Sequence, residues 1–298
     1  MVNPLAAAGL ALALISTPHA ALAQSAQNPS PMVEHTRAHP RLKPIEIKSE
    51  RHRLSLGTLT VPTGLVGKAE ISPLLIHFHG ANWIADVAAA SIGSASLAVN
   101  LGSGSTAYAK PFRAPARFRK LLAEAEAASG TRFAEVTLSG WSAGCGAIRE
   151  ILKSPDNDTR IAKVILIDGI HTGYPKGSPG PLESEIDPAP LAPLLRFARL
   201  ATAGEKTMIV THSEIFPGTY ASTTETADWM LRELDLRRRA ILKWGPMQTQ
   251  QLSECRSASF YLAGFAGNSA PDHVDQLHSL PDLLHWPPED VEAAESKE

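Results

Sequence analysis

The segment Gly140-Trp141-Ser142-Ala143-Gly144 constrains the fold of this chain more than any other. It follows an apolar run, residues 133–138, that predicts a buried strand, and it precedes a helical pattern over residues 144–153. A serine between such a strand and helix lies in a sharp, strained turn, so its neighbours two positions away must be small. The two glycines meet that requirement. We therefore expect Ser142 to be a nucleophile rather than an ordinary serine in a tight turn.

Short apolar runs that predict strands alternate with segments of helical periodicity along most of the chain. The strand-like runs are 53–61 (an antiparallel edge strand), 74–78, 96–101, 133–138, 163–167, 207–211 and 257–262. The helical segments are 83–95, 115–128, 144–153, 191–201, 223–236 and 273–284. This alternation predicts the α/β class, with a mostly parallel sheet flanked by helices.

The domain boundaries follow from composition. A chain of 298 residues fits one large α/β domain, which we place at residues 41–286. Residues 172–190 are rich in Pro, Gly and acidic residues and interrupt the alternation, so we expect a cap insertion at about 172–203. Residues 287–298 form an acidic tail.

The first residues have the pattern of a secretory signal peptide. An apolar run, residues 5–15, precedes Ala21-Leu22-Ala23, a small-x-small cleavage pattern. We expect cleavage after Ala23, a disordered leader over 24–40, and export to the periplasm or the medium. The alternative is a buried N-terminal helix. The run is shorter than the ~20 apolar residues of a membrane span, so we expect no stable membrane insertion of the mature protein.

Composition and motifs argue against several classes of ligand. The formal net charge of −2 gives no electrostatic reason to bind nucleic acid. The segment Gly102-Ser103-Gly104 lacks the remainder of a phosphate-binding or dinucleotide-binding motif. His77 and His79 are predicted to share one face of a strand, which makes metal binding a weak alternative. We expect no cofactor and no metal.

A second motif follows the strand at 74–78. There the chain continues as His79-Gly80-Ala81. The backbone amides of Ala81 and Ala143 are positioned in sequence to form an oxyanion hole, with possible help from the Asn82 side chain. His79 precedes the serine in the chain, so we expect it to be structural.

With these motifs the chain resembles the α/β-hydrolase superfamily from about Arg53 to Leu284. The resemblance implies an oxyanion loop, a nucleophile elbow, an acid and a histidine, in that chain order. The acid then lies at a strand end after the nucleophile, and Asp168 is favoured over Glu214. The histidine lies beyond the last strand. His273 is favoured over His278, which a helix would carry ~7 Å further along its axis.

The resemblance implies a serine hydrolase that acts on carboxylic esters through Ser142, His273 and Asp168. The expected partner is a small-molecule or lipid-like ester, and no nucleic acid. Amidase, thioesterase, lipase or depolymerase action uses the same chemistry and stays open. A non-catalytic binding protein that kept the fold is the alternative from another class.

The two cysteines, Cys145 and Cys255, are expected not to pair. In the family's strand order their strands are about three places apart, or roughly 14 Å. A disulfide needs Cα atoms within about 7 Å.

Overall fold

The computed structural model describes residues 41–67, 72–176 and 185–286. The predicted signal peptide, leader and acidic tail lie outside the described residues. Within the described ranges, none of the helices combines the length and the apolar character that crossing a bilayer requires.

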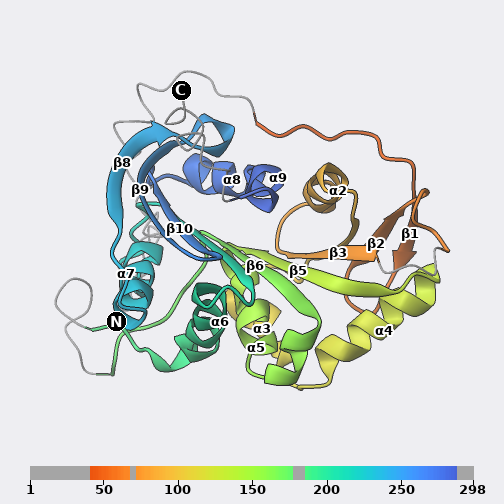
Figure 1. Ribbon diagram of the computed structural model, residues 1–298, viewed down its shortest axis with the longest axis horizontal. Coiled ribbons are helices and arrows are strands. Elements are labelled where there is room, and N and C mark those ends of the chain that lie inside the picture. The colour runs from red at the N-terminus through yellow and green to blue at the C-terminus, as the bar shows by residue number, and fades with distance from the viewer. Residues whose placement is uncertain (1–40, 68–71, 177–184, 287–298) are drawn as a thin grey trace, which may run out of the picture.

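The described residues form one ten-stranded sheet in the order β1-β2-β4-β3-β5-β6-β7-β10-β9-β8 (Figure 1). Its centre is parallel. The central strands are β4 (Ala95–Val99), β3 (Ser72–Phe78), β5 (Phe133–Trp141), β6 (Ile161–Ile167), β7 (Thr207–His212) and β10 (Phe260–Phe265). These strands arise from the apolar runs noted above, because a parallel sheet is covered on both faces and buries nearly every side chain.

Both ends of the sheet are antiparallel. The region predicted as one edge strand is a hairpin of β1 (Ser49–Arg53) and β2 (Thr58–Pro62). At the other end lie β9 (Gln250–Ser257) and β8 (Arg239–Trp244), neither of which was predicted. β9 is largely polar, so no apolar run marks it in the sequence. β8 contains Ala240, Ile241, Leu242 and Trp244, but it is an edge strand whose side chains are mostly exposed.

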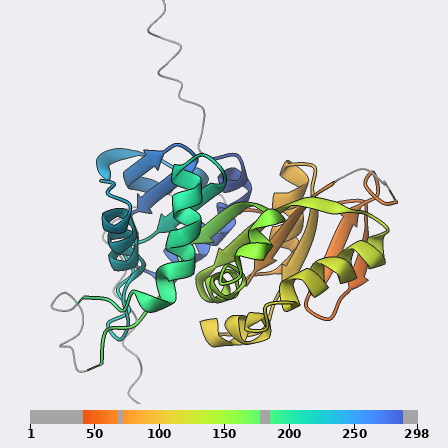
Figure 2. The same ribbon diagram turned by 60° about the horizontal axis from the view of Figure 1, so that its bottom comes forward.

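Two layers of helices cover the sheet (Figures 1 and 2). The apolar cluster of one face includes side chains of α2 (Asn82–Ser91), α8 (Ala270–His278) and α9 (Leu280–Leu284). The cluster of the other face includes side chains of α3 (Ser105–Phe112), α4 (Arg117–Ser129), α5 (Cys145–Ile151), α6 (Ala192–Thr202) and α7 (Thr223–Glu233). Short 3-10 turns cover Ser142–Gly144, Pro155–Thr159, Ala189–Leu191 and Pro246–Gln248.

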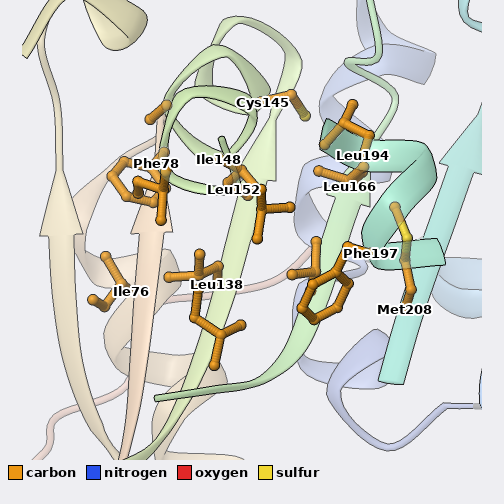
Figure 3. Close-up of a cluster of buried hydrophobic side chains, with 14 of the residues drawn as sticks. Ile76, Phe78, Leu138, Cys145, Ile148, Leu152, Leu166, Leu194, Phe197 and Met208 are labelled. Atoms are coloured by element: carbon orange, nitrogen blue, oxygen red, sulfur yellow. The ribbon is translucent and has the colours of Figure 1, made fainter. Parts of the chain in front are cut away.

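The helix that follows the serine packs directly on the strands that flank it. Figure 3 shows Ile148 and Leu152 of this region in one cluster with Leu138 of β5 and Leu166 of β6. All four side chains are fully buried. This packing fixes α5, and with it the turn that contains Ser142, against the centre of the sheet.

Only part of the region predicted as a cap, residues 172–203, could cover the site. Its second half is α6, whose Leu194, Phe197 and Ala201 side chains are buried in the core beneath β7 and β10 (Figure 3). Residues 192–202 are therefore a layer helix of the domain. Residues 172–176 and 185–191 remain for a covering segment, and 177–184 lie outside the described residues.

The prediction for the cysteines is confirmed, since Cys145 and Cys255 are both free and buried. The strands associated with the two cysteines are further apart in the sheet than the three places expected. Cys255 lies on β9, one place beyond β10, and is therefore four strands from β5.

The position of α6 predicts the effect of Phe197→Ala. Because the ring is fully buried, its removal should lower the free energy of unfolding by about 3–5 kcal/mol in urea titrations. Arg199→Ala, on an exposed position of the same helix, should change it by less than about 0.5 kcal/mol. Equal stability of the two variants would mean that α6 covers the site instead of forming the core.

Candidate active site

The site lies where several parallel strands end. Ser142 follows β5, Asp168 follows β6, and Ser213 follows β7. Trp141 is paired with Ile167 in the sheet, so Ser142 and Asp168 leave neighbouring strands side by side. The carboxyl ends of parallel strands share one edge of the sheet, which is where α/β proteins place their ligands.

The backbone at Ser142 is strained, with φ of 49°. Neighbouring backbone approaches the turn so closely that only glycine fits around it. A Cβ on Gly144 would lie 2.0 Å from the carbonyl oxygen of Phe78, and one on Gly140 would lie 2.9 Å from the Cys145 nitrogen. Gly169 approaches from β6, where a Cβ would lie 2.4 Å from the Ser142 carbonyl oxygen. These contacts hold the serine at the start of α5, as the sequence pattern predicts.

The carboxylate of Asp168 is buried, with 1% of the residue exposed, and it accepts four hydrogen bonds. Oδ1 accepts from the Ser213 amide at 2.9 Å and from Thr223 Oγ1 at 2.7 Å. Oδ2 accepts from Ser213 Oγ and lies 2.7 Å from His273 Nδ1. Burial alone would raise the pKa, but the bonds from His273 and Ser213 outweigh it and lower the pKa of Asp168 to about 2.

The tautomer of His273 follows from that ionisation. An ionised carboxylate only accepts hydrogen bonds, so Nδ1 of His273 is the donor in this bond, and in the neutral imidazole Nε2 is then the acceptor. The backbone of His273 is also fixed, because its carbonyl accepts from Trp141 Nε1 at 2.9 Å. The rings of Trp141 and His273 are in contact, with centroids 4.6 Å apart.

His273 lies in the first turn of α8, whose N-terminus is formed by a capping box of Ser269 and Asp272. The helix therefore begins three residues earlier than predicted. The cap orients the first turn over the sheet edge, so that the imidazole points back to Asp168.

The other candidates make different contacts. Glu214 is exposed, and its carboxylate accepts from the Gly267 amide at 3.3 Å. His278 lies near the C-terminus of α8, with its ring edge-on to Trp83 at 5.7 Å. The structure thus brings Asp168 and His273 together and places Glu214 and His278 elsewhere.

The loop after β3 is held by Asn100 and adjoins the site. The Asn100 side chain accepts from the Gly80 amide at 3.0 Å and donates to the Gly80 carbonyl and to Asn82 Oδ1. The Gly80 amide therefore donates to Asn100. The next backbone amide in the chain is that of Ala81, the residue before the first turn of α2. Ala143 lines the cavity described below.

His77 lies in β3 and His79 in the loop after it, so the expectation of two imidazoles on one strand face is wrong. His77 is buried in β3 beside Ser139, at 3.1 Å, and burial lowers its pKa to about 4. His79 follows the strand with φ of 72°, contacts the Tyr108 hydroxyl at 2.8 Å and stacks on Trp141. In the described part of the chain no cluster of three or more His, Cys, Asp or Glu side chains could hold a metal ion.

A cavity of about 730 Å³ opens beside Ser142. Its wall is formed by His79, Ser103, Gly104, Ser105, Thr106, Ser142, Ala143, Arg149, His171, Thr172, Gly173, Pro190 and Tyr220. Thr172, Gly173 and Pro190 come from the segment that remains of the predicted cap. A volume of this size accommodates a small organic molecule.

Sequence reasoning missed the residues that support the predicted ones. Ser213 and Thr223 complete the bonding of Asp168, Asn100 fixes the loop after β3, and Arg149 lines the cavity. A hydroxyl directly after a strand was a visible signal for Ser213. Thr223, Asn100 and Arg149 are polar residues of helices or loops with no distinguishing sequence pattern. Only the three-dimensional structure shows that they lie at the site.

Two observations decide the fold: the strand order, with an antiparallel β2 beside a parallel centre, and the strained serine between β5 and α5. The chain has the α/β-hydrolase fold. No family model matches its sequence, and no curated protein matches it in sequence.

Solved structures with this fold are similar to it at low sequence identity. A poly(3-hydroxybutyrate) depolymerase from Bordetella parapertussis is 14% identical over 84% of this chain and 95% of its own, with a TM-score of 0.46. A carboxylesterase from Bacillus subtilis is 10% identical over 82% and 92%, with a TM-score of 0.41. A monoglyceride lipase variant from Saccharomyces cerevisiae is 12% identical over 83% and 98%, with a TM-score of 0.40.

The low pKa of Asp168 predicts how stability depends on pH. Its carboxyl binds a proton more weakly in the folded than in the unfolded chain, so its contribution to stability is complete above about pH 4. It is lost as the pH falls toward about 2, and it amounts to on the order of 2 kcal/mol. In urea titrations between pH 6 and pH 2, Asp168→Asn should flatten the pH dependence by that amount.

The matched control for this measurement is Asp156→Asn, whose side chain is 83% exposed. It should leave the pH dependence unchanged. If Asp168→Asn loses as much stability between pH 6 and pH 2 as the wild type, the pKa of Asp168 is not lowered by folding.

Proposed function

We propose that the protein is a serine hydrolase of carboxylic esters, with Ser142 as nucleophile, His273 as base and Asp168 as the acid that orients the base. The observation that carries this proposal is the 2.7 Å hydrogen bond between His273 and the saturated carboxylate of Asp168, at the sheet edge where the strained Ser142 lies. The α/β-hydrolase fold and the ester-hydrolase names of the similar structures are in keeping with it.

In the first half of the reaction, Ser142 Oγ attacks the acyl carbon and its proton passes to Nε2 of His273. Nδ1 stays hydrogen-bonded to Asp168, which stabilises the imidazolium that forms. The oxyanion binds the amides of Ala143, in the turn after the nucleophile, and Ala81, in the loop that Asn100 holds. Collapse of the tetrahedral intermediate releases the alcohol, which takes the proton from His273.

In the second half, water attacks the acyl-enzyme and gives its proton to His273. The carboxylic acid leaves, and Ser142 regains its proton from the imidazole. Every proton thus passes between the substrate, water and the side chains of Ser142 and His273, and the proposed reaction needs no cofactor.

We also propose that the enzyme acts outside the cytoplasm, on the strength of the signal-peptide pattern over residues 1–23. Amidase, thioesterase, lipase and depolymerase action share the acyl-enzyme chemistry and are narrower forms of the same proposal. A non-catalytic binding protein is the alternative that the next experiment addresses.

Ser142→Ala should reduce hydrolysis of p-nitrophenyl acetate by several orders of magnitude and abolish labelling by a fluorophosphonate probe, because the nucleophile is gone. Ser103→Ala, which removes another hydroxyl from the cavity wall, should keep both. A folded wild-type protein that neither labels nor hydrolyses any of a graded series of p-nitrophenyl esters would support the binding-protein alternative.

Paired variants test the other two residues. His273→Ala should abolish the acylation burst while His278→Ala retains it, because only His273 contacts the acid. Asp168→Asn should lower turnover by about 10⁴, since it favours the wrong imidazole tautomer, while Glu214→Gln stays near wild type. The reverse ranking within either pair, measured by stopped-flow on one activated ester, would reassign that residue.

A further inference from the structure

The chemistry of the cavity wall is uneven. Side chains with hydroxyls recur along it, among them Ser103, Ser105, Thr106 and Thr172. Among the described residues that line it, Arg149 is the one Arg or Lys, and none is acidic. The wall has no Leu, Ile, Val, Met or Phe in that set.

Arg149 lies in the last turn of α5, the helix that follows the nucleophile. Ser142 precedes this helix, in the 3-10 turn Ser142–Gly144. Helical side chains lean toward the N-terminus, and this carries the guanidinium back toward Ser142. Both residues line the one cavity.

The guanidinium has donors to spare. Its Nη1 donates to the carbonyl oxygen of His171 at 3.3 Å. In the described ranges no carboxylate lies within ion-pair distance of it. An arginine has five N–H donors and keeps its charge at any physiological pH, so this bond to His171 uses only part of the bonding capacity of Arg149.

Two neighbours bear on the charge in this part of the cavity. Burial lowers the pKa of His171 to about 4, so its imidazole is neutral at pH 7 and adds no second positive charge beside Arg149. On the other side, Gly146 of α5 meets the backbone of Ser105 so closely that a Cβ would lie 2.5 Å from the Ser105 carbonyl oxygen. This contact holds the N-terminus of α3, which has no side-chain cap, against the same cavity.

We propose that Arg149 selects esters that carry a carboxylate, and that it binds this second anionic group while Ser142 attacks the ester carbonyl. The inference rests on the proposed function and narrows its substrate class. Guanidinium and carboxylate match in geometry and form paired charge-assisted hydrogen bonds. A lipid-like ester with a plain alkyl chain leaves this cation desolvated and unpaired, which is unfavourable.

Matched pairs of esters test the proposal. For a carboxylate on the acyl side, the 4-nitrophenyl hemiester of glutaric acid is compared with 4-nitrophenyl pentanoate. For one on the alcohol side, 4-acetoxybenzoate is compared with phenyl acetate. The wild-type enzyme should favour the charged member of at least one pair by 10-fold or more in kcat/KM, and the preference should shrink at high salt.

Variants assign that preference to the side chain. Arg149→Gln should reduce the charged-to-neutral ratio of kcat/KM by about 10- to 100-fold, the range of a hydrogen bond to a charged group, and Arg149→Lys should retain part of it. The control is Lys153→Gln, which removes a cation just past α5 that is already paired with Glu150. It should keep the wild-type ratio, and thermal melting should show that all variants are folded.

A binding measurement separates this inference from the proposed function. Calorimetry on Ser142→Ala with monomethyl glutarate should give a Kd that Arg149→Gln weakens about 10-fold or more. Neutral esters hydrolysed with no preference for the charged member, or a preference that survives Arg149→Gln, would overturn the inference and leave the hydrolase proposal intact. Absent hydrolysis with Arg149-dependent binding would overturn the hydrolase proposal alone.

Discussion

The buried carboxylate of Asp168 is the interaction on which the geometry of the site depends. A buried charge is tolerated only when its acceptors are filled, and Asp168 fills them with donors from three separate segments. Ser213 comes from the end of β7, Thr223 from the first turn of α7 and His273 from the first turn of α8. These segments must converge for the charge to be stable, so the bonding that stabilises the fold also places the imidazole.

The second constraint is steric and acts at the nucleophile. Gly140, Gly144 and Gly169 let the backbone of the nucleophile turn approach its neighbours more closely than a side chain would permit. Gly144 lies against Phe78 of β3, Gly140 against Cys145, and Gly169 against Ser142 itself. This close packing sets the start of α5 against β3 and β6. Steric contacts fix the position of Ser142, whereas hydrogen bonds fix that of Asp168. The two residues follow the neighbouring strands β5 and β6.

The helix α5 carries a further residue of the cavity wall on the same rigid support. A functional group carried on a packed helix is held more rigidly than one on a loop. Its buried side chains, such as Ile148, pack it against the sheet (Figure 3). Ser142 precedes this helix, and Arg149, in its last turn, lines the cavity. The nucleophile and the cation are therefore both positioned by the packing of α5 and of the turn before it on the sheet.

The sequence predicted the central parallel strands and the helices beside them, because their apolar runs report burial directly. It failed for β9, where the buried positions include Gln251 and Ser253, so alternation is not expressed in hydrophobicity. It failed for α3 because Gly104 precedes that helix and Pro111 lies inside it. It assigned α6 to a cap because the preceding residues are rich in Pro and Gly.

The sequence by itself determined the alternation of the central strands with most of the helices, and the strained turn at Ser142, because these follow from periodicity and from residue size over a few neighbouring positions. It named Asp168 and His273 only through a resemblance. The tertiary structure decided that these two side chains, 105 residues apart, are in contact, and that Ser213 and Thr223 support them. It also decided that Arg149 faces the cavity. Such contacts depend on which strands are neighbours in the sheet. Local sequence patterns do not determine this strand order.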